Sequence, residues 1–138
     1  MPDVSFEAIR EEWARDSQLD LDDIPGEVVR RHQQHQKYLE LFIQAREIAT
    51  ALTLKLKRVR RERYDYYMGR SDEVSPVRIL KSEVDMYVDS DPEVIAVTAK
   101  LEAAKMQMDY LERVLWILKD RGSDLRTAFE ARKFMEGR

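Results

Sequence analysis

The sequence predicts an all-α fold: a long helical hairpin with short helices near the N-terminal and C-terminal ends of the chain. Two long stretches carry apolar residues at steps of three and four, the spacing that puts side chains on one face of an α-helix. Gly and Pro, four of each in 138 residues, interrupt neither stretch. Because 37% of the residues are charged, one chain has few apolar side chains for a large core of its own. Part of the apolar surface is therefore expected to pair with further copies.

Residues 1–26 are expected to form a short N-terminal helix and an acidic connector. Ser5 is a candidate N-cap for a helix over residues 5–15, in which Phe6, Ile9 and Trp13 have helical spacing. Asp20 to Gly26 contains Pro25-Gly26 and is predicted to be a turn. Its acidic residues form either a solvated loop or a surface that screens basic groups or contacts a partner.

Residues 27–70 are expected to form one long helix of about 40 residues that carries a strongly basic strip. Gly69 can adopt the left-handed conformation that ends a helix. So long a helix needs packing partners along its length. Apolar or semi-apolar positions follow its helical period: Val28, His32, His35, Leu39, Phe42, Ala49, Leu52, Leu56, Val59, Arg63 and Tyr66.

Residues 71–138 are expected to form a helical C-terminal part for packing and self-association. After a loop over 71–76, a shorter amphipathic helix is predicted to carry Val77, Leu80, Val84 and Tyr87. Ser90-Asp91-Pro92-Glu93 is a helix start, because Ser90 or Asp91 can cap, proline is tolerated in the first turn, and carboxylates there favour the helix dipole.

The next stretch has the most regular spacing in the chain and predicts a coiled-coil seam. Its positions are Val94, Val97, Leu101, Ala104, Met108, Leu111, Leu115 and Leu118. Packed on the long helix, this seam makes an antiparallel hairpin. Arg121-Gly122-Ser123-Asp124 is expected to end that helix and cap a C-terminal one. The residues expected to carry packing and oligomerisation are Leu101, Met108, Leu111, Leu115, Leu118, Phe129 and Phe134.

The candidate functional segment is the basic strip, residues 55–67. Six of the nine residues from Lys55 to Arg63 are cationic, although the whole chain has a net charge of −3. Cations on one helical face neutralise phosphates, and an aromatic ring among them gives a base a surface to stack on. Helical spacing puts Tyr64 on the cationic face and Tyr66 with the apolar residues, while Tyr67 fits either. The predicted single-stranded DNA-binding residues are Lys55, Lys57, Arg58, Arg60, Arg61, Arg63 and Tyr64.

Other uses of the basic strip stay open from these residues alone. A charged helical face can simply be solvated, and a basic amphipathic helix can lie on a membrane or enter a partner's groove. The weak apolar face beside the cluster, without Trp or Phe, argues against a membrane. The rival functions are a coiled-coil scaffold whose strip binds an acidic protein and an architectural protein that binds duplex DNA.

The sequence offers no catalytic residue, metal site or cofactor site. His32 and His35 share a helical face, but neither cysteine nor a third histidine completes a zinc site. The glycines are isolated, so no phosphate-binding loop is present, and the carboxylates lie on solvated faces. We expect a non-enzymatic protein. The absence of cysteine, of an apolar run near 18 residues and of a signal peptide predicts a soluble, intracellular protein.

Several short runs in the later part of the chain carry a family resemblance. They are Arg63-Tyr64-Asp65-Tyr66-Tyr67-Met68-Gly69-Arg70, Lys81-Ser82-Glu83, Asp91 with Glu93-Val94, Lys119-Asp120-Arg121-Gly122, and Arg132 to Arg138 with Phe134, Glu136 and Gly137. These runs resemble the UvsY recombination mediator proteins of T-even-like bacteriophages. The resemblance covers roughly residues 55–138, in the family's order and spacing, with a small length change after Arg70.

The resemblance implies an accessory factor of homologous recombination, replication and repair in the cytoplasm of an infected bacterial cell. Such a protein binds single-stranded DNA, contacts the phage single-strand binding protein, and helps load the phage RecA-like recombinase. The family forms ring-like oligomers of six or seven subunits through its C-terminal part. Its DNA-binding basic positions fall on Arg61 and Arg63, where this chain has a denser basic cluster.

Overall fold

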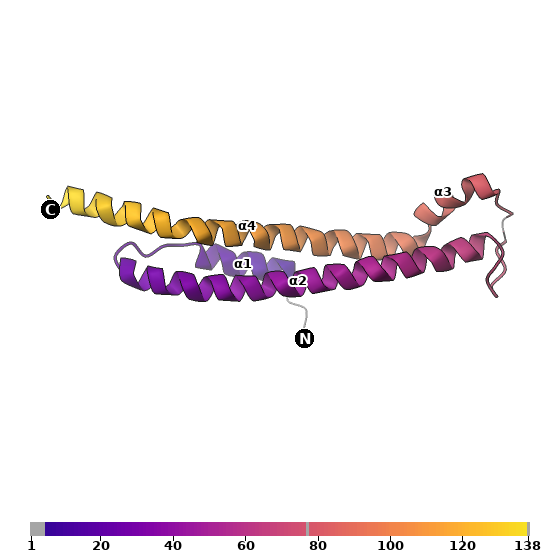
Figure 1. Cartoon of the computed structure of the whole chain (residues 1–138), viewed down its shortest axis with the longest axis horizontal. Helices are drawn as coiled ribbons and strands as arrows, with labels where there is room; N and C mark the ends of the chain where they lie inside the picture. The colour runs from indigo at the N-terminus through magenta and orange to yellow at the C-terminus, as the bar shows by residue number, and fades with distance from the viewer. Residues whose placement is uncertain (1–4, 77, 138) are drawn as a thin grey trace. The chain divides into compact units, whose positions relative to one another are not determined.

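The computed structural model describes residues 5–76 and 78–137 and is helical throughout its regular elements (Figure 1). No strand occurs in this described part, so the all-α prediction is confirmed. In chain order the elements are helix α1 (Phe6–Asp16), helix α2 (Ile24–Tyr67), the 3₁₀ turn η1 (Lys81–Glu83), helix α3 (Val84–Asp89) and helix α4 (Pro92–Met135).

The chain packs as two compact units, each built from a segment of α2 and a segment of α4. The first unit holds the described residues up to Gln44 and from Gln107 onward, and includes α1. The second unit runs from Ala45 to Met106 and includes η1 and α3. Within each unit the α2 and α4 segments run antiparallel, as predicted for a hairpin (Figure 1).

Helix α1 forms as predicted and packs through two buried side chains. The Ser5 hydroxyl accepts a hydrogen bond from the backbone N–H of Ala8 at 3.2 Å, which satisfies a donor of the first turn. Ile9 and Trp13 are buried on one face. The Trp13 ring meets the Tyr38 ring edge to face, with centroids 5.3 Å apart. This contact docks α1 on α2.

Helix α2 begins three residues before the predicted Glu27, so the expectation that Pro25-Gly26 forms a turn is wrong. The Asp23 carboxylate accepts a hydrogen bond from the Gly26 backbone N–H at 3.1 Å, in the manner of an N-cap. Proline is tolerated in a first helical turn because no intrahelical bond is lost there. A Cβ at Gly26 would lie 2.0 Å from a carboxylate oxygen of Asp23, so glycine leaves room for this cap.

The buried face of α2 in the first unit differs from the predicted one. Val28, His32 and His35 are exposed and Leu39 is half-buried. The buried positions lie on a neighbouring face and are mostly polar or amphipathic: Ile24, Glu27, Gln34 and Tyr38. A search for apolar residues misses such a face, because hydrogen bonds from other elements satisfy its polar groups. In the second unit, the buried Ala49 and Val59 and the half-buried Leu52 and Leu56 agree with the prediction.

The end of α2 has the predicted glycine cap. Gly69 has a φ of +75°, in the left-handed region. The Arg70 N–H donates to the Asp65 carbonyl at 2.8 Å and the Gly69 N–H donates to the Tyr66 carbonyl at 3.2 Å, the two bonds of a Schellman motif. The chain therefore leaves the helix immediately after the basic strip.

The predicted helix after the loop is shorter than expected. Val77 lies outside the described residues, and Leu80 is 66% exposed in non-helical backbone. Regular structure begins only at η1, and α3 buries Val84 and Val88. Two buried valines give this segment one short packed turn instead of a full amphipathic helix.

Helix α4 runs unbroken to Met135, so the predicted break at 121–124 and the separate C-terminal helix are wrong. An interior glycine weakens a helix by only about 1 kcal/mol relative to alanine. Packing outweighs that cost because Arg121 and Leu125, on either side of Gly122, are both buried.

The predicted seam of α4 is largely buried. Leu101 and Ala104 are buried in the second unit, and Leu111 and Leu118 in the first. Between the latter two, Val114 is buried and the predicted Leu115 is only half-buried. The buried stripe therefore passes through position 114 instead of position 115. This stripe continues through the buried Arg121 and Leu125, which lie three and seven residues after Leu118.

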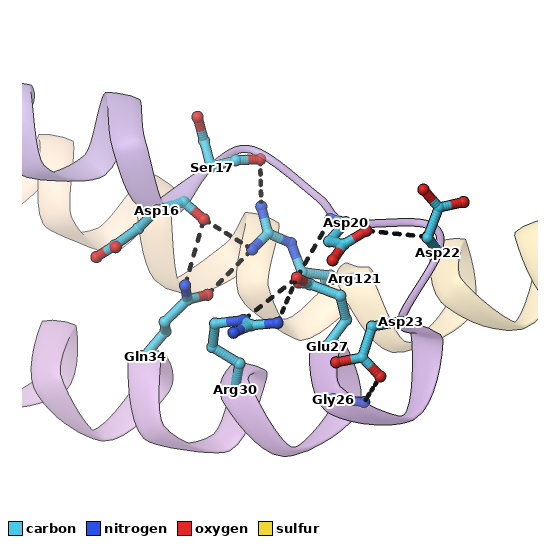
Figure 2. A network of polar contacts seen from close by, with 10 residues as sticks. All are labelled: Asp16, Ser17, Asp20, Asp22, Asp23, Gly26, Glu27, Arg30, Gln34 and Arg121. Atoms are coloured by element: carbon cyan, nitrogen blue, oxygen red, sulfur yellow. Dashed lines mark hydrogen bonds and ion pairs between the residues drawn. The ribbon is translucent and has the colours of Figure 1, made fainter.

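A buried arginine joins the three helical segments of the first unit (Figure 2). Arg121 is 4% exposed and donates to the carbonyls of Asp16 at 3.2 Å and Ser17 at 2.9 Å, and to the side-chain oxygen of Gln34 at 3.1 Å. Gln34 also donates to the Asp16 carbonyl at 3.3 Å. The last carbonyls of a helix lack intrahelical donors, so α4 supplies the C-terminal cap of α1.

Buried Glu27 organises the connector between α1 and α2 (Figure 2). Its carboxylate accepts hydrogen bonds from the Asp20 backbone N–H at 3.2 Å and from Arg30 at 2.9 Å. The acidic connector is therefore tied to α2, and it is not only a solvated loop.

Replacing Arg121 with Met keeps an apolar stem but removes all three hydrogen bonds. Leaving the buried acceptors unpaired should lower the free energy of unfolding by about 3 kcal/mol. Urea unfolding followed by circular dichroism measures this change. Arg113→Met, at an exposed position on the same helix, is the control and should change stability by less than about 0.5 kcal/mol. Equal effects of the two variants would contradict the role given to Arg121.

Candidate nucleic-acid interface

A small apolar cluster in the second unit sets the orientation of the basic strip. Its buried members come from α2, α3 and α4: Val59, Val84, Val88, Val94 and Val97. Leu56, Tyr64, Tyr67 and Met68 pack against it. Arg60 and Arg63, four residues after Leu56 and Val59, lie on the side of the cluster, and the other four cations of the strip are exposed.

The six cations of the basic strip fall into two groups. Arg60 and Arg63 share the helical face of Leu56, Val59 and Tyr67, and both are half-buried. The other four, which we call the outer cations, are Lys55, Lys57, Arg58 and Arg61. All four are exposed, and none makes an ion pair with any residue that the structure describes.

The outer cations lie close to one another along the helix. Arg61 is three residues from Arg58 and four from Lys57, spacings that bring side chains together on a helical surface. Like charges at these spacings destabilise an isolated helix by about 0.2–0.5 kcal/mol per pair. Glu62 is exposed and pairs with none of them in the described structure. The cluster therefore has unused capacity for an external anion.

Arg63, unlike the outer cations, is held inside the protein. Its Nε donates to the Asp91 carboxylate at 2.8 Å, with side-chain exposures of 18% and 1% for the two residues. Its guanidinium lies 4.1 Å from the centre of the Tyr66 ring. These contacts give the guanidinium an intramolecular partner on both its edge and its face. The expected role of Arg63 in binding DNA stays a prediction, and this geometry does not support it.

Asp91 holds Arg63 and also begins α4. One carboxylate oxygen accepts the backbone N–H of Glu93 at 2.8 Å, and the other accepts the Tyr67 hydroxyl at 2.6 Å along with Arg63. The predicted cap at this position is thus confirmed. Burial by itself would raise the pKa of Asp91, but these hydrogen bonds outweigh burial and lower the pKa. Asp91 also raises the pKa of Arg63, although burial opposes that change.

Arg60 makes a weaker ion pair. Its guanidinium lies 2.7 Å from the Asp89 carboxylate, but the side chains are 41% and 63% exposed. Exposed pairs of this kind contribute about 0–1 kcal/mol to stability. A phosphate can replace Asp89 at small cost, so Arg60 is accessible to an anionic ligand.

The tyrosines are placed differently from the prediction. Tyr64 packs against the apolar cluster, with Arg70 over its ring at 6.0 Å, and does not lie among the outer cations. Tyr66, expected in the core, is half-buried beneath Arg63. The reason is that the buried face continues from Arg60 to Tyr64 and from Arg63 to Tyr67, both steps of four.

The described residues contain no group of three or more His, Asp or Glu side chains arranged to hold a metal ion. Among them, no helix has a segment long and apolar enough to cross a membrane.

The predicted packing residues also differ in burial. Leu101, Leu111 and Leu118 are buried within the chain, whereas Met108 and Leu115 are half-buried. Phe129 and Phe134 are 49% and 85% exposed. These two side chains are free for contacts outside the chain, and their assignment to self-association stays a prediction.

Comparison with known proteins identifies the relatives of this chain. Residues 12–138 match the profile of the UvsY family, described as recombination, repair and ssDNA-binding proteins. The chain belongs to the UvsY family. The recombination protein uvsY of Enterobacteria phage T4 is 25% identical over 137 residues, covering 98% of this chain and 100% of the phage protein.

Crystal structures of the bacteriophage T4 recombination mediator protein UvsY have the same fold as this chain. The structure in lattice type II aligns with a TM-score of 0.90 at 24% identity, covering 97% of this chain and 99% of that one. The structure in lattice type I aligns with a TM-score of 0.85 at 25% identity, covering 91% and 97%. The resemblance expected from residues 55–138 is confirmed, and the family match begins earlier, at residue 12.

Family membership assigns the chain to recombination, repair and single-stranded DNA binding, the class of function that the basic strip predicts. The role of Asp91 as the partner of Arg63 was missed by sequence reasoning. A signal for it was present, because Arg63 lies four residues after Val59 on the apolar face of the strip. A charged residue at such a position needs a buried partner of opposite charge.

Asp91→Asn should lower the free energy of unfolding by about 3 kcal/mol at pH 7, since it leaves Arg63 without its buried carboxylate. The pKa of Asp91 is lowered in the folded protein, so the wild-type advantage is present above the unfolded pKa of about 4 and is lost as pH falls below it. Urea titrations of wild type and Asp91→Asn at pH 7 and at pH 3 measure the difference in free energy of unfolding at each pH.

Asp109→Asn, an exposed carboxylate on the same helix, is the matched control and should have little effect at either pH. A difference between wild type and Asp91→Asn that stays constant from pH 7 to pH 3 would refute the ionised pair.

Proposed function

We propose that this chain is a recombination mediator that binds single-stranded DNA through its outer cations and helps load a RecA-like recombinase onto strands covered by a single-strand binding protein. The observation that carries the proposal is the exposure of Lys55, Lys57, Arg58 and Arg61 without an ion pair in the described structure. Four adjacent cations on a rigid helix suit a polyanion better than a neutral ligand.

The binding site of one chain is small. The segment from Lys55 to Arg61 extends about 10 Å along the helix, which is enough for only a few phosphates. Binding by one copy should therefore be weak and sensitive to salt. Several copies on one strand raise the overall affinity by about 10²–10⁴ without a new contact, provided that the strand reaches all of them.

Assembly into a ring-like homo-oligomer supplies that repetition. The exposed apolar side chains at the end of α4 support self-association there, since Phe134 and Met135 are each more than 80% exposed. The resemblance to the family implies six or seven subunits. In this proposal the ring bends the strand, weakens the hold of the single-strand binding protein, and presents the DNA backbone to the recombinase in the cytoplasm of the infected cell.

The double variant Arg58→Ala/Arg61→Ala should weaken binding of single-stranded DNA about equally for every sequence. It should also reduce the slope of log affinity against log salt by about 0.7 for each lost phosphate contact. Fluorescence anisotropy with labelled oligothymidylate at several salt concentrations gives both quantities. Helicity should not change, because neither side chain has an ion pair to lose in the described structure.

Arg113→Ala is the matched control, since it removes an exposed cation from the other unit. Duplex DNA and a poly-glutamate peptide, titrated in parallel, test the architectural and scaffold alternatives. An unchanged salt slope in the double variant, or a preference for either competitor, would count against the proposal. Arg63 is left unaltered because its replacement would leave the buried Asp91 carboxylate unpaired and would therefore also lower stability.

Phe134→Asp should lower the mass measured by sedimentation velocity while helicity is kept, because this side chain is 85% exposed within the chain. Leu111→Asp, by contrast, should unfold the first unit, since Leu111 is 0% exposed. An oligomer of unchanged mass in Phe134→Asp would show that another surface carries self-association.

A further inference from the structure

The first unit contains a groove of about 490 Å³ between the beginning of α2 and the later turns of α4. Its base is apolar, with Ile24 and Leu125 buried beneath it. Val28 and Phe129 line it as well and are 40% and 49% exposed. The volume falls within the range of about 300–1,000 Å³ that is usual for ligand pockets.

The charged side chains that line the groove are all cationic: Arg31, Lys119 and Arg126. None of them forms an ion pair with a residue that the structure describes. The Nε of Arg31 is buried without a hydrogen-bond partner, and it is the only buried side-chain nitrogen or oxygen in the described residues with this property. A buried donor without an acceptor is unfavourable, so Arg31 has hydrogen-bonding capacity that the described residues do not use.

The glycine inside α4 maintains this arrangement. A Cβ at Gly122 would lie 2.3 Å from Nη1 of Arg31, well inside any real contact distance. Any larger residue would push the guanidinium out of its place against α4. Gly122 therefore does not end the helix, as its sequence context predicts, and instead leaves room for Arg31.

We propose that this groove binds an acidic peptide segment of a partner protein, with one large apolar side chain on Ile24 and Leu125 and carboxylates on Arg31, Lys119 and Arg126. The charge of the rim and the apolar base together favour this ligand. Arginine binds carboxylates with two parallel hydrogen bonds, and an apolar anchor in a groove between helices is a common mode of peptide recognition.

A nucleic acid fits the groove less well. Phe129 is the only aromatic side chain that lines it, so successive bases would find no series of stacking surfaces. Asp22 and Asp23 directly precede Ile24, and Asp22 already lies 3.6 Å from Arg132. A long polyanion that crosses this end would meet both carboxylates, whereas a short peptide within the groove need not.

The test uses a fluorescein-labelled peptide in which a central Leu-Phe pair is flanked by two Glu residues on each side. The wild-type protein should bind it at least tenfold more tightly than a version with Gly-Gly in the centre or with Gln in place of Glu. Arg31→Met should weaken binding at least tenfold without lowering the melting temperature, because it removes an unpaired buried donor. Gly122→Ala should also weaken binding, and Arg113→Ala should not.

Binding that is absent, or equal for the Leu-Phe and Gly-Gly peptides, overturns the proposal. So does displacement of the peptide by oligothymidylate with loss of DNA affinity in Arg31→Met, which would make the groove a nucleic-acid site. A lower sedimentation mass in Arg31→Met with unchanged peptide binding also overturns it, since a second copy would then fill the groove. Arg58→Ala/Arg61→Ala should bind the peptide normally, which separates this test from that of the DNA-binding strip.

Discussion

The buried carboxylate of Asp91 determines how the basic strip is presented. One of its oxygens binds the first turn of α4, and the other binds Arg63 and Tyr67 near the end of α2. A single side chain thus begins one helix and sets the rotation of another about its axis. With Arg63 turned toward Asp91, helical geometry directs Arg58 and Arg61 away from the apolar cluster. The exposed face of the strip follows from an internal ion pair as much as from the run of cations.

Both units use an arginine as a structural group. Arg63 in the second unit bonds to a carboxylate, and Arg121 in the first bonds to backbone carbonyls and an amide. Arg31 is the exception, since its Nε is buried with no acceptor in the described residues. In this chain the role of an arginine depends on its bonding partners more than on its presence in a charged segment. Arginines bonded within the chain are structural, and those without a partner are available to a ligand. Three arginines that look alike in the sequence have three different roles.

Much of the fold could be predicted from the sequence because local signals determine it. Ser5, Gly69 and Asp91 each have a side chain or backbone conformation that begins or ends a helix, and all three act as predicted. The errors occur where long-range packing outweighs a local signal. Gly122 is typical of a helix end, yet α4 continues through it because Arg121 and Leu125 are buried on either side.

The candidate site was predicted in outline but not in detail, for the same reason. The density of cations identifies the strip, but helical spacing alone cannot show which of them have internal partners. Glu27 and Gln34 were missed as buried residues because hydrogen bonds offset their polarity, from Asp20 and Arg30 for Glu27 and from Arg121 for Gln34. The groove around Arg31 was not predictable, since it brings together residues almost 100 positions apart.

The division of the strip into two inner and four outer cations has a consequence for how DNA would leave the protein. In the proposed oligomer each subunit would offer the strand only the four unpaired cations of the strip, so no single subunit would hold the strand firmly. A strand held by many weak contacts can be peeled away one subunit at a time, and each step crosses only a small barrier. A growing recombinase filament could then take over the DNA progressively, without ever competing against the whole assembly at once.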